Sequence, residues 1–168
     1  MNTVELKKYL QNNEYTRIYF KGVFACNNVV TLPSISKYFI IVNTDKSDEK
    51  GEHWIVFFYN NNILEIFDSL GCVPSMYKGL INYLRTWKGI IKFNKQILQS
   101  PISNFCGIHC LFYCYIKCYK NFTLNCIVAR YYIKDVDFND CNILRITKTL
   151  YSIDCTIIKK MLITQACD

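Results

Sequence analysis

The chain has 168 residues, of which 51% are hydrophobic and 15% aromatic, and its formal net charge is +7 at pH 7. This composition excludes a disordered tail or a linker, because such segments lack the apolar residues that form a core. We expect one domain over residues 1–168, burying roughly 70% of the surface that the unfolded chain exposes. The polar start Met1 to Asn13 has no signal-peptide pattern and no apolar run reaches membrane-spanning length, so we expect neither secretion nor membrane insertion.

The N-terminal part of the chain predicts a helix followed by strands. Thr3 to Gln11 is expected to be helical, with Thr3 as its N-cap. Arg17 to Phe24 and Lys37 to Val42 are predicted to be strands. The charged loop Thr44 to Gly51 then leads into the next strand, and we expect it to border a cleft.

A predicted β-hairpin carries the first two candidate site residues. His53 to Tyr59 is an apolar, aromatic and β-branched run typical of a buried strand, Asn60 to Asn62 is a turn signal, and Ile63 to Phe67 is a second strand. His53 begins one strand and Asp68 follows the other, so both are expected at the same sheet edge. There a carboxylate can hold an imidazole in the tautomer that a general base needs. Asp is also common in turns, and the two roles are compatible.

The segment Gln99 to Gly107 indicates a nucleophile. Cys106 and Gly107 open a stretch, Ile108 to Tyr119, that has no Pro or further Gly and is predicted to be helical. A thiol at a helix N-terminus faces the positive end of the helix dipole, which favours the thiolate. Gln99, on the approach to this helix, can donate to a developing oxyanion. The candidate residues for acyl transfer are therefore His53, Asp68, Gln99 and Cys106.

Each of these candidates has a competing interpretation. Cys106 taken alone could be one more buried cysteine, and His53 could be a core histidine; their combination with Gln99 favours a site. The only other histidine, His109, shares a helix face with Cys106 at i, i+3 and is a rival base. We rank it second, because a group on the same helix is poorly placed to approach the thiol from the substrate side.

The ten cysteines do not indicate a metal site or a disulfide framework. Cys106, Cys110, Cys114 and Cys118 recur every four residues, which on a helix gives one stripe and not a tetrahedral ligand set. No Cys-x-x-Cys occurs. We expect no metal, and free thiols that act as small hydrophobes in a reducing compartment.

The remaining elements complete the predicted fold class, which is α+β. We expect a mixed β-sheet packed against a central helix that carries the nucleophilic cysteine at its N-terminus, with additional C-terminal helices. Pro74 to about Trp87 is predicted to be a helix weakened at Gly79, and Gly89 to Phe93 a strand. The predicted C-terminal helices are Thr123 to Ile133, Asn139 to Ser152 and Ile157 to Gln165.

The order His, acid, Gln, Cys resembles the adenovirus-type (adenain-like) cysteine proteases, which also occur in virus-like transposons and virophages. The similarity covers about residues 15–118. The SUMO-protease-like enzymes share this architecture, but their nucleophile usually follows an Asp, whereas Phe105 precedes Cys106 here, which favours the viral branch. The matching segments are Ile41 to Trp54, Phe67 to Gly71 and Gln99 to Cys110, with a weaker match at Phe20 to Phe24.

The resemblance implies a cysteine endopeptidase with a Cys-His-Asp triad and an oxyanion Gln. Its spacing selects Gln99 over the neighbouring Gln96. The implied substrates are viral precursor polypeptides, cleaved next to small residues or Gly during particle maturation, in the virion and the infected cell (nucleus or cytoplasmic viral factory). We expect a monomer. A ubiquitin/SUMO-like deconjugating protease and a non-catalytic basic DNA-binding module remain as alternatives.

An acid-free stretch suggests a polyanion partner. Ser69 to Lys134 contains no Asp or Glu, and such a stretch is a possible electrostatic footprint for nucleic acid, although the basic residues need not converge in space. The family resemblance implies non-specific DNA as an activating cofactor. The candidate DNA contacts are Lys78, Arg85, Lys88, Lys92, Lys95, Lys117, Lys120 and Arg130.

A disulfide-linked activating peptide is not expected. In adenovirus proteases the anchoring cysteine lies eleven residues before the oxyanion glutamine, a position that Lys88 occupies in this chain. No cysteine lies between Cys72 and Cys106. The resemblance therefore implies that any activation of this chain is non-covalent.

Overall fold

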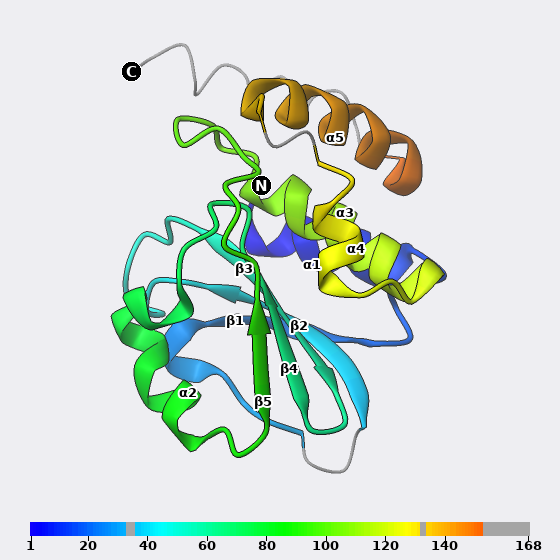
Figure 1. Ribbon diagram of the computed structural model, residues 1–168. Helices are drawn as coiled ribbons and strands as arrows, with labels where there is room; N and C mark the ends of the chain where they lie inside the picture. The colour runs from blue at the N-terminus through cyan, green and yellow to red at the C-terminus, as the bar shows by residue number, and fades with distance from the viewer. Residues whose placement is uncertain (33–35, 132–133, 153–168) are drawn as a thin grey trace.

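The computed structural model describes residues 1–32, 36–131 and 134–152 (Figure 1). These residues form five strands and five α-helices, with short 3₁₀ turns at Cys26–Asn28, Pro74–Met76 and Lys78–Leu80. The strands are β1 (Phe20–Ala25), β2 (Lys37–Asn43), β3 (Trp54–Asn60), β4 (Ile63–Phe67) and β5 (Ile90–Phe93). The helices are α1 (Thr3–Asn12), α2 (Ile81–Thr86), α3 (Cys106–Lys120), α4 (Leu124–Val128) and α5 (Val136–Tyr151).

The strands form one mixed sheet in the order β1-β2-β3-β4-β5. The outer pairs β1–β2 and β4–β5 are parallel, and the inner pairs β2–β3 and β3–β4 are antiparallel. The β3–β4 hairpin pairs Val56 with Phe67 and turns through Asn61, which adopts the left-handed conformation (φ 52°) that Asn tolerates well. The predicted hairpin and mixed sheet are confirmed.

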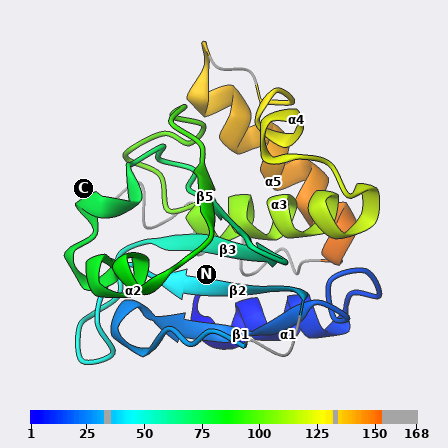
Figure 2. The same ribbon diagram turned by 60° about the horizontal axis from the view of Figure 1, so that its bottom comes forward.

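Both faces of the sheet are covered, which explains why its central strands are apolar at nearly every position. Alternate side chains enter two separate cores. One core lies against α1, α3, α4 and α5 and contains Phe39, Ile41, Val56, Phe58 and Phe67. The other lies against α2 and the neighbouring 3₁₀ turns and contains Tyr38, Ile40, Ile55, Phe57 and Leu80. In Figure 1 and Figure 2, α3 lies between α5 and the sheet, which confirms the predicted central helix.

Some predicted element boundaries are wrong for local reasons. The N-cap of α1 is Asn2 and not Thr3: the Asn2 side chain accepts from the Glu5 N–H, and the Glu5 carboxylate accepts from the Asn2 N–H. This reciprocal pair is a capping box. The first strand begins at Phe20, because Thr16 to Tyr19 form a turn in which the Thr16 carbonyl accepts from the N–H groups of Tyr19 and Phe20.

The predicted helix Pro74 to Trp87 is interrupted at Tyr77, whose backbone is extended (φ −82°, ψ 95°). Two 3₁₀ turns, one on each side of Tyr77, precede the short helix α2. Gly79, the position expected to weaken the helix, lies within the second turn, where a Cβ atom would clash with Sγ of Cys26.

The C-terminal helices also differ from the prediction. The helix predicted from Thr123 to Ile133 ends at Val128, and α5 begins at Val136, where the Asp135 side chain caps it by accepting from the Phe138 N–H. The predicted helix Ile157 to Gln165 lies outside the described residues.

The central helix is tied to the sheet by a buried ion pair. Lys117 Nζ lies 2.5 Å from Glu65 Oε2, on β4, and also donates to the Phe122 carbonyl at 3.0 Å. The Tyr113 hydroxyl donates to the same carboxylate at 3.1 Å. Only 4% of Lys117 is exposed. The interpretation of Lys117 as a DNA contact is therefore corrected, because its ammonium is buried and already paired.

We predict that Lys117→Met lowers the free energy of unfolding by about 3–5 kcal/mol, because it leaves the Glu65 carboxylate buried without its cation. Urea denaturation measures the change. Lys120→Met, at an exposed position on the same helix, is the matched control and should change stability by less than about 0.5 kcal/mol. Equal effects of the two substitutions would show that the ion pair does not hold α3 in place.

Candidate active site

The ends of β3 and β4 bring His53 and Asp68 together at one sheet edge. His53 directly precedes β3 and Asp68 directly follows β4. Nε2 of His53 lies 2.7 Å from Oδ1 of Asp68, and both side chains are buried. The predicted proximity of the two residues is confirmed.

Hydrogen bonds fix both the carboxylate and the backbone of Asp68. Its Oδ1 also accepts from the Leu70 N–H at 2.8 Å, and its Oδ2 accepts from the Tyr77 hydroxyl at 2.6 Å. The Asn94 side chain accepts from the Asp68 N–H at 2.9 Å and donates to its carbonyl at 2.6 Å. Asp68 therefore caps its own turn and binds His53 at the same time. These bonds leave the carboxylate a single orientation toward the imidazole.

Cys106 is the first residue of α3, as predicted, and it lies close enough to His53 to raise the pKa of the imidazole. Because Nε2 of His53 faces Asp68, Nδ1 is the ring nitrogen left for the sulfur. Burial would by itself lower the pKa of His53, but the hydrogen bond to Asp68 and the nearby Cys106 outweigh burial and raise it from 6.5 to about 10. His53 is consequently an imidazolium at neutral pH, next to a thiol at the positive end of a helix.

The Gln99 side chain is fixed by two serines. Its Oε1 accepts from the Ser69 hydroxyl at 2.7 Å, and its Nε2 donates to the Ser103 carbonyl at 2.7 Å. The Gln99 backbone N–H donates to the Ser69 carbonyl at 3.0 Å. Ser69 directly follows Asp68, so one turn holds both side chains. The structure thus joins His53 to Asp68 by a hydrogen bond, places Cys106 near the imidazole, and connects Gln99 to the turn of Asp68 through Ser69.

The sequence analysis did not identify three residues that hold the candidate site residues in place. Ser69 is the second residue after β4, and Asn94 directly follows β5. Parallel strands end at the same sheet edge, so polar residues at these two positions were a usable signal. Tyr77 had no such signal, because a 3₁₀ turn brings it to Asp68. Its ring stacks on His53 with 6.3 Å between centroids.

The rival histidine occupies a different site. His109 is fully buried, its Nε2 lies 2.8 Å from Oδ1 of Asp140, and its Nδ1 lies 3.3 Å from the Tyr131 hydroxyl. Both ring nitrogens therefore have partners away from the thiol. This arrangement agrees with ranking His109 behind His53 as the base.

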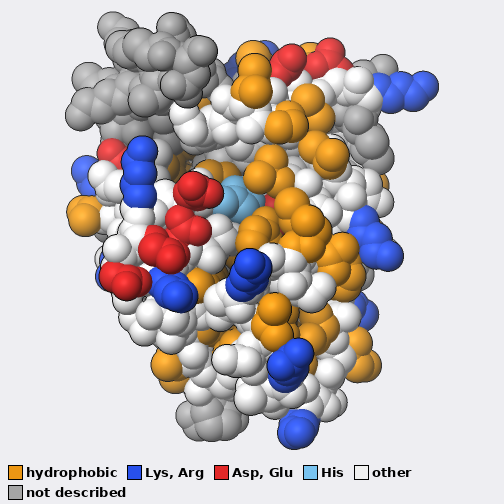
Figure 3. All heavy atoms as spheres, turned by 90° about the vertical axis from the view of Figure 1, so that its left-hand side faces the viewer, with side chains coloured by type: hydrophobic (Ala, Val, Ile, Leu, Met, Phe, Trp, Pro, Cys, Tyr) orange, Lys and Arg blue, Asp and Glu red, His pale blue; other side chains and the backbone are white. Residues whose placement is uncertain are grey.

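A hollow surrounds the exposed edge of the site. Figure 3 shows a histidine at its bottom, with acidic side chains on one side and hydrophobic ones on the other; His53 is the histidine with exposed surface. A cavity of about 470 Å³ next to Trp54 is lined by residues of α1, β1 and the charged loop, including Lys46, Glu49 and Gly51. The charged loop thus borders a cavity, and its expected place beside the substrate cleft stays a prediction.

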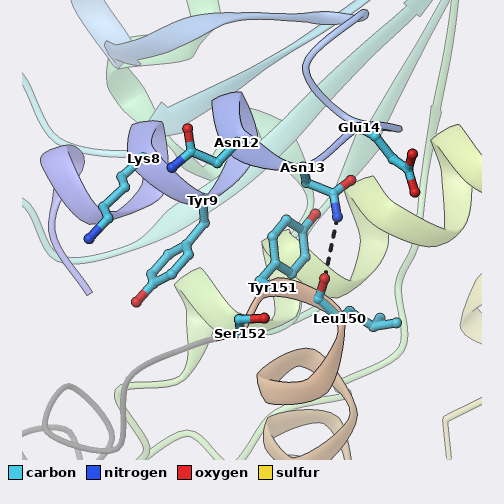
Figure 4. A pocket seen from close by; sticks show the side chains of 8 residues that line it. All are labelled: Lys8, Tyr9, Asn12, Asn13, Glu14, Leu150, Tyr151 and Ser152. Atoms are coloured by element: carbon cyan, nitrogen blue, oxygen red, sulfur yellow. Dashed lines mark hydrogen bonds between the residues drawn. The ribbon is translucent and has the colours of Figure 1, made fainter.

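Another cavity, of about 520 Å³, lies between the C-terminal ends of α1 and α5 (Figure 4). There the Asn13 side chain donates to the Leu150 carbonyl at 3.3 Å. None of the predicted site residues lines this cavity.

The other predicted binding residues are dispersed over the surface. Apart from Lys117, every candidate DNA contact is exposed, and together they extend from the turn before α2 through β5 to the ends of α3 and α4. DNA contact stays a prediction. Among the described residues, no group of three or more His, Cys, Asp or Glu could hold a metal, the cysteines are free, and no helix is long and apolar enough to cross a membrane.

Comparisons with known proteins agree with the resemblance. No family model matches the chain. A curated protein described as "Protease", from Bovine adenovirus 4, is 27% identical over 128 residues, which cover 66% of this chain and 63% of that protein. The crystal structure of the ASFV pS273R protease superposes with a TM-score of 0.52 at 15% identity, covering 83% of this chain and 63% of that one. The chain thus spans less than two thirds of either protein. The resemblance to adenain-like viral proteases and the fold class are confirmed.

We predict that the two histidines titrate at opposite extremes. The chain has only two, so NMR of labelled imidazoles separates them. His53 should titrate near pH 10, and Asp68→Asn should lower its midpoint because the anionic partner is lost. Burial lowers the pKa of His109, so His109 should stay neutral from pH 6.5 upward.

The raised pKa of His53 makes the free energy of unfolding depend on pH. The pKa of His53 is higher in the folded than in the unfolded protein, so its imidazolium stabilises the fold fully below about pH 6.5, and this contribution is lost as pH rises through about 10. The stability difference between the wild type and His53→Gln, from urea denaturation, should shrink over this range. A midpoint for His53 near 6.5 would contradict both expectations.

Proposed function

We propose that this chain, which resembles adenain-like viral proteases in sequence and fold, is a cysteine endopeptidase. The observation that carries the proposal is the buried His53–Asp68 pair, 2.7 Å apart, next to Cys106 at the start of a buried helix, where Cys106 raises the pKa of the imidazole. A thiol paired with an imidazolium reacts as a thiolate at neutral pH. The supporting network around Asp68 orients the imidazole, as a triad requires.

In the proposed reaction, the Cys106 thiolate attacks the carbonyl carbon of the peptide bond and forms a C–S bond. The carbonyl oxygen becomes an oxyanion, and His53 donates its proton to the leaving nitrogen as the C–N bond breaks. Water, deprotonated by the now neutral His53, then attacks the thioester carbonyl. The acid is released and the Cys106 thiolate and His53 imidazolium are restored.

We assign oxyanion stabilisation to Gln99 and the backbone N–H of Cys106. The amide of Gln99 is oriented by Ser69 and Ser103, and its Nε2 carries a second hydrogen besides the one bound to the Ser103 carbonyl. Because both partners are buried, this donor needs little reorganisation when charge develops.

We further propose that the substrates are viral precursor polypeptides with small residues, chiefly Gly, next to the cleaved bond. Crowding beside the nucleophile supports this preference. A Cβ atom at Gly107 would lie 3.0 Å from the Met1 side chain, and the Trp54 indole donates to the Met1 carbonyl at 3.2 Å. A groove with such walls leaves little room for large side chains. Cleavage would accompany particle maturation in the virion or the infected cell.

The proposed activator is non-specific DNA, bound by the exposed basic residues of the acid-free stretch. A disulfide-linked peptide is not proposed. Cys72 lies beside the site, close enough to Tyr77 to raise the pKa of its hydroxyl, and not on the edge strand β5. We propose that the enzyme acts as a monomer.

We predict that Cys106→Ala and His53→Ala abolish cleavage of a Gly-containing peptide, and that Gln99→Ala lowers kcat by about 10²–10³ because one oxyanion donor is lost. Mass spectrometry after treatment with a peptide vinyl sulfone should show one adduct, on Cys106. Cys126→Ala, at an exposed cysteine, is the control and should retain full activity. Cleavage of ubiquitin-like conjugates without peptide cleavage would instead indicate a deconjugating enzyme, and absence of any adduct would exclude the protease.

We predict that double-stranded DNA binds without sequence preference and stimulates cleavage. Fluorescence anisotropy across a salt series should show log Kd rising with log salt, by about 0.9 for each phosphate neutralised. The triple change Lys88→Gln, Lys92→Gln and Lys95→Gln should weaken binding, whereas Lys7→Gln with Lys8→Gln on α1 removes charge outside the acid-free stretch and should not. Salt-independent binding, or none at low salt, contradicts the proposal.

A further inference from the structure

A second buried histidine–carboxylate pair lies behind the candidate site. His109 is on α3, three residues after Cys106, and its Nε2 lies 2.8 Å from Oδ1 of Asp140 on α5. The exposed fraction is 0% for His109 and 3% for Asp140. The proposed reaction uses neither group. Burying a carboxylate costs solvation free energy, so the pair needs another explanation.

The partners of His109 indicate which nitrogen carries its proton. Burial raises the pKa of Tyr131 well above its usual range, so this phenol remains a donor, and it lies 3.3 Å from Nδ1. Burial lowers the pKa of His109, against the effect of its bond to Asp140, so the ring is neutral. A neutral ring that accepts at Nδ1 donates at Nε2. The series therefore runs from the Tyr131 hydroxyl through His109 to the Asp140 carboxylate.

The other oxygen of Asp140 reaches the oxyanion segment. Oδ2 accepts from the backbone N–H of Ser100 at 3.3 Å, and Ser100 directly follows Gln99. On the side of this segment away from Asp140, the backbone N–H of Gln99 donates to the Ser69 carbonyl. The Gln99–Ser100 segment is thus held between the turn after β4 and helix α5.

We propose that Asp140 and His109 are positioning residues that set the place of Gln99 relative to Cys106. His109 and Cys106 lie on one rigid helix, about 4.5 Å apart along its axis. The bond from His109 fixes Asp140 relative to this helix, and Asp140 fixes Ser100. The distance between oxyanion donor and nucleophile is thereby determined by two buried hydrogen bonds. This inference rests on the proposed protease function.

A purely structural role for the pair makes a different prediction. Apolar side chains of similar volume would also pack α3 against α5, often with equal stability, but they would not bind the Ser100 N–H. Positioning therefore predicts a loss of turnover that is separable from any loss of stability. It also predicts that the loss is confined to steps in which an oxyanion develops.

The test measures kcat and KM for peptide cleavage beside the rate of Cys106 alkylation by iodoacetamide, which forms no oxyanion. Asp140→Ala should lower kcat about 10–100-fold with KM within about twofold, because a displacement of about 1 Å at a reacting group has effects of this size. The alkylation rate and its pH midpoint should match the wild type. Asp137→Ala, at an exposed position on the same helix, is the control and should retain full kcat.

A double-variant cycle links the effect to Gln99. If Asp140 acts through Gln99, Asp140→Ala combined with Gln99→Ala is no slower than Gln99→Ala alone. His109→Gln, which keeps an amide donor, should retain more kcat than His109→Ala. If Asp140→Ala does not fold, the comparison of His109→Gln with His109→Ala tests the proposal in its place.

Three results would overturn the inference alone: wild-type kcat in folded Asp140→Ala and His109→Ala, alkylation that falls in parallel with kcat, or independent losses in the double variant. A wild-type protein that alkylates at Cys106 but cleaves no peptide would overturn the proposed function, and this inference with it.

Discussion

The buried contact between α3 and β4 is the constraint on which the site depends. Tyr113, in the middle of α3, and Lys117, near its C-terminal end, both bind Glu65 in the middle of β4. A helix is rigid, so fixing these turns on the sheet also fixes the position of Cys106 at its N-terminal end. Since Asp68 directly follows β4, the same strand carries the anchor and leads into the proposed triad acid.

One turn, which contains Asp68 and Ser69, orients both the candidate base and the candidate oxyanion donor. Asp68 orients the imidazole, and Ser69, its neighbour, orients the Gln99 amide. Asn94 binds the backbone of Asp68 from the end of β5. The hydrogen bonds that stabilise the sheet edge therefore also orient the proposed base and the proposed oxyanion donor, and a displacement of this turn would affect both.

The two histidines show how environment separates identical side chains. Each is buried and bound to an Asp, yet the pKa of His53 is raised and that of His109 lowered. The pKa values differ because Cys106 next to His53 favours the imidazolium, whereas His109 is more deeply buried and is repelled by the charge of His53. One imidazole is therefore suited to proton transfer, and the other to holding α3, α5 and the Gln99 segment together.

The sequence by itself determined the hairpin, the mixed sheet, the start of α3 and the proximity of His53 to Asp68, because alternation, turn residues and helix starts are local signals. Only the tertiary structure decided that Lys117 is buried and that Tyr77 and Asp140 reach the site. Each of these depends on a contact between different segments of the chain: Lys117 with Glu65, Tyr77 with Asp68, and Asp140 with Ser100. A local sequence pattern does not predict which distant residue will pack beside a given side chain.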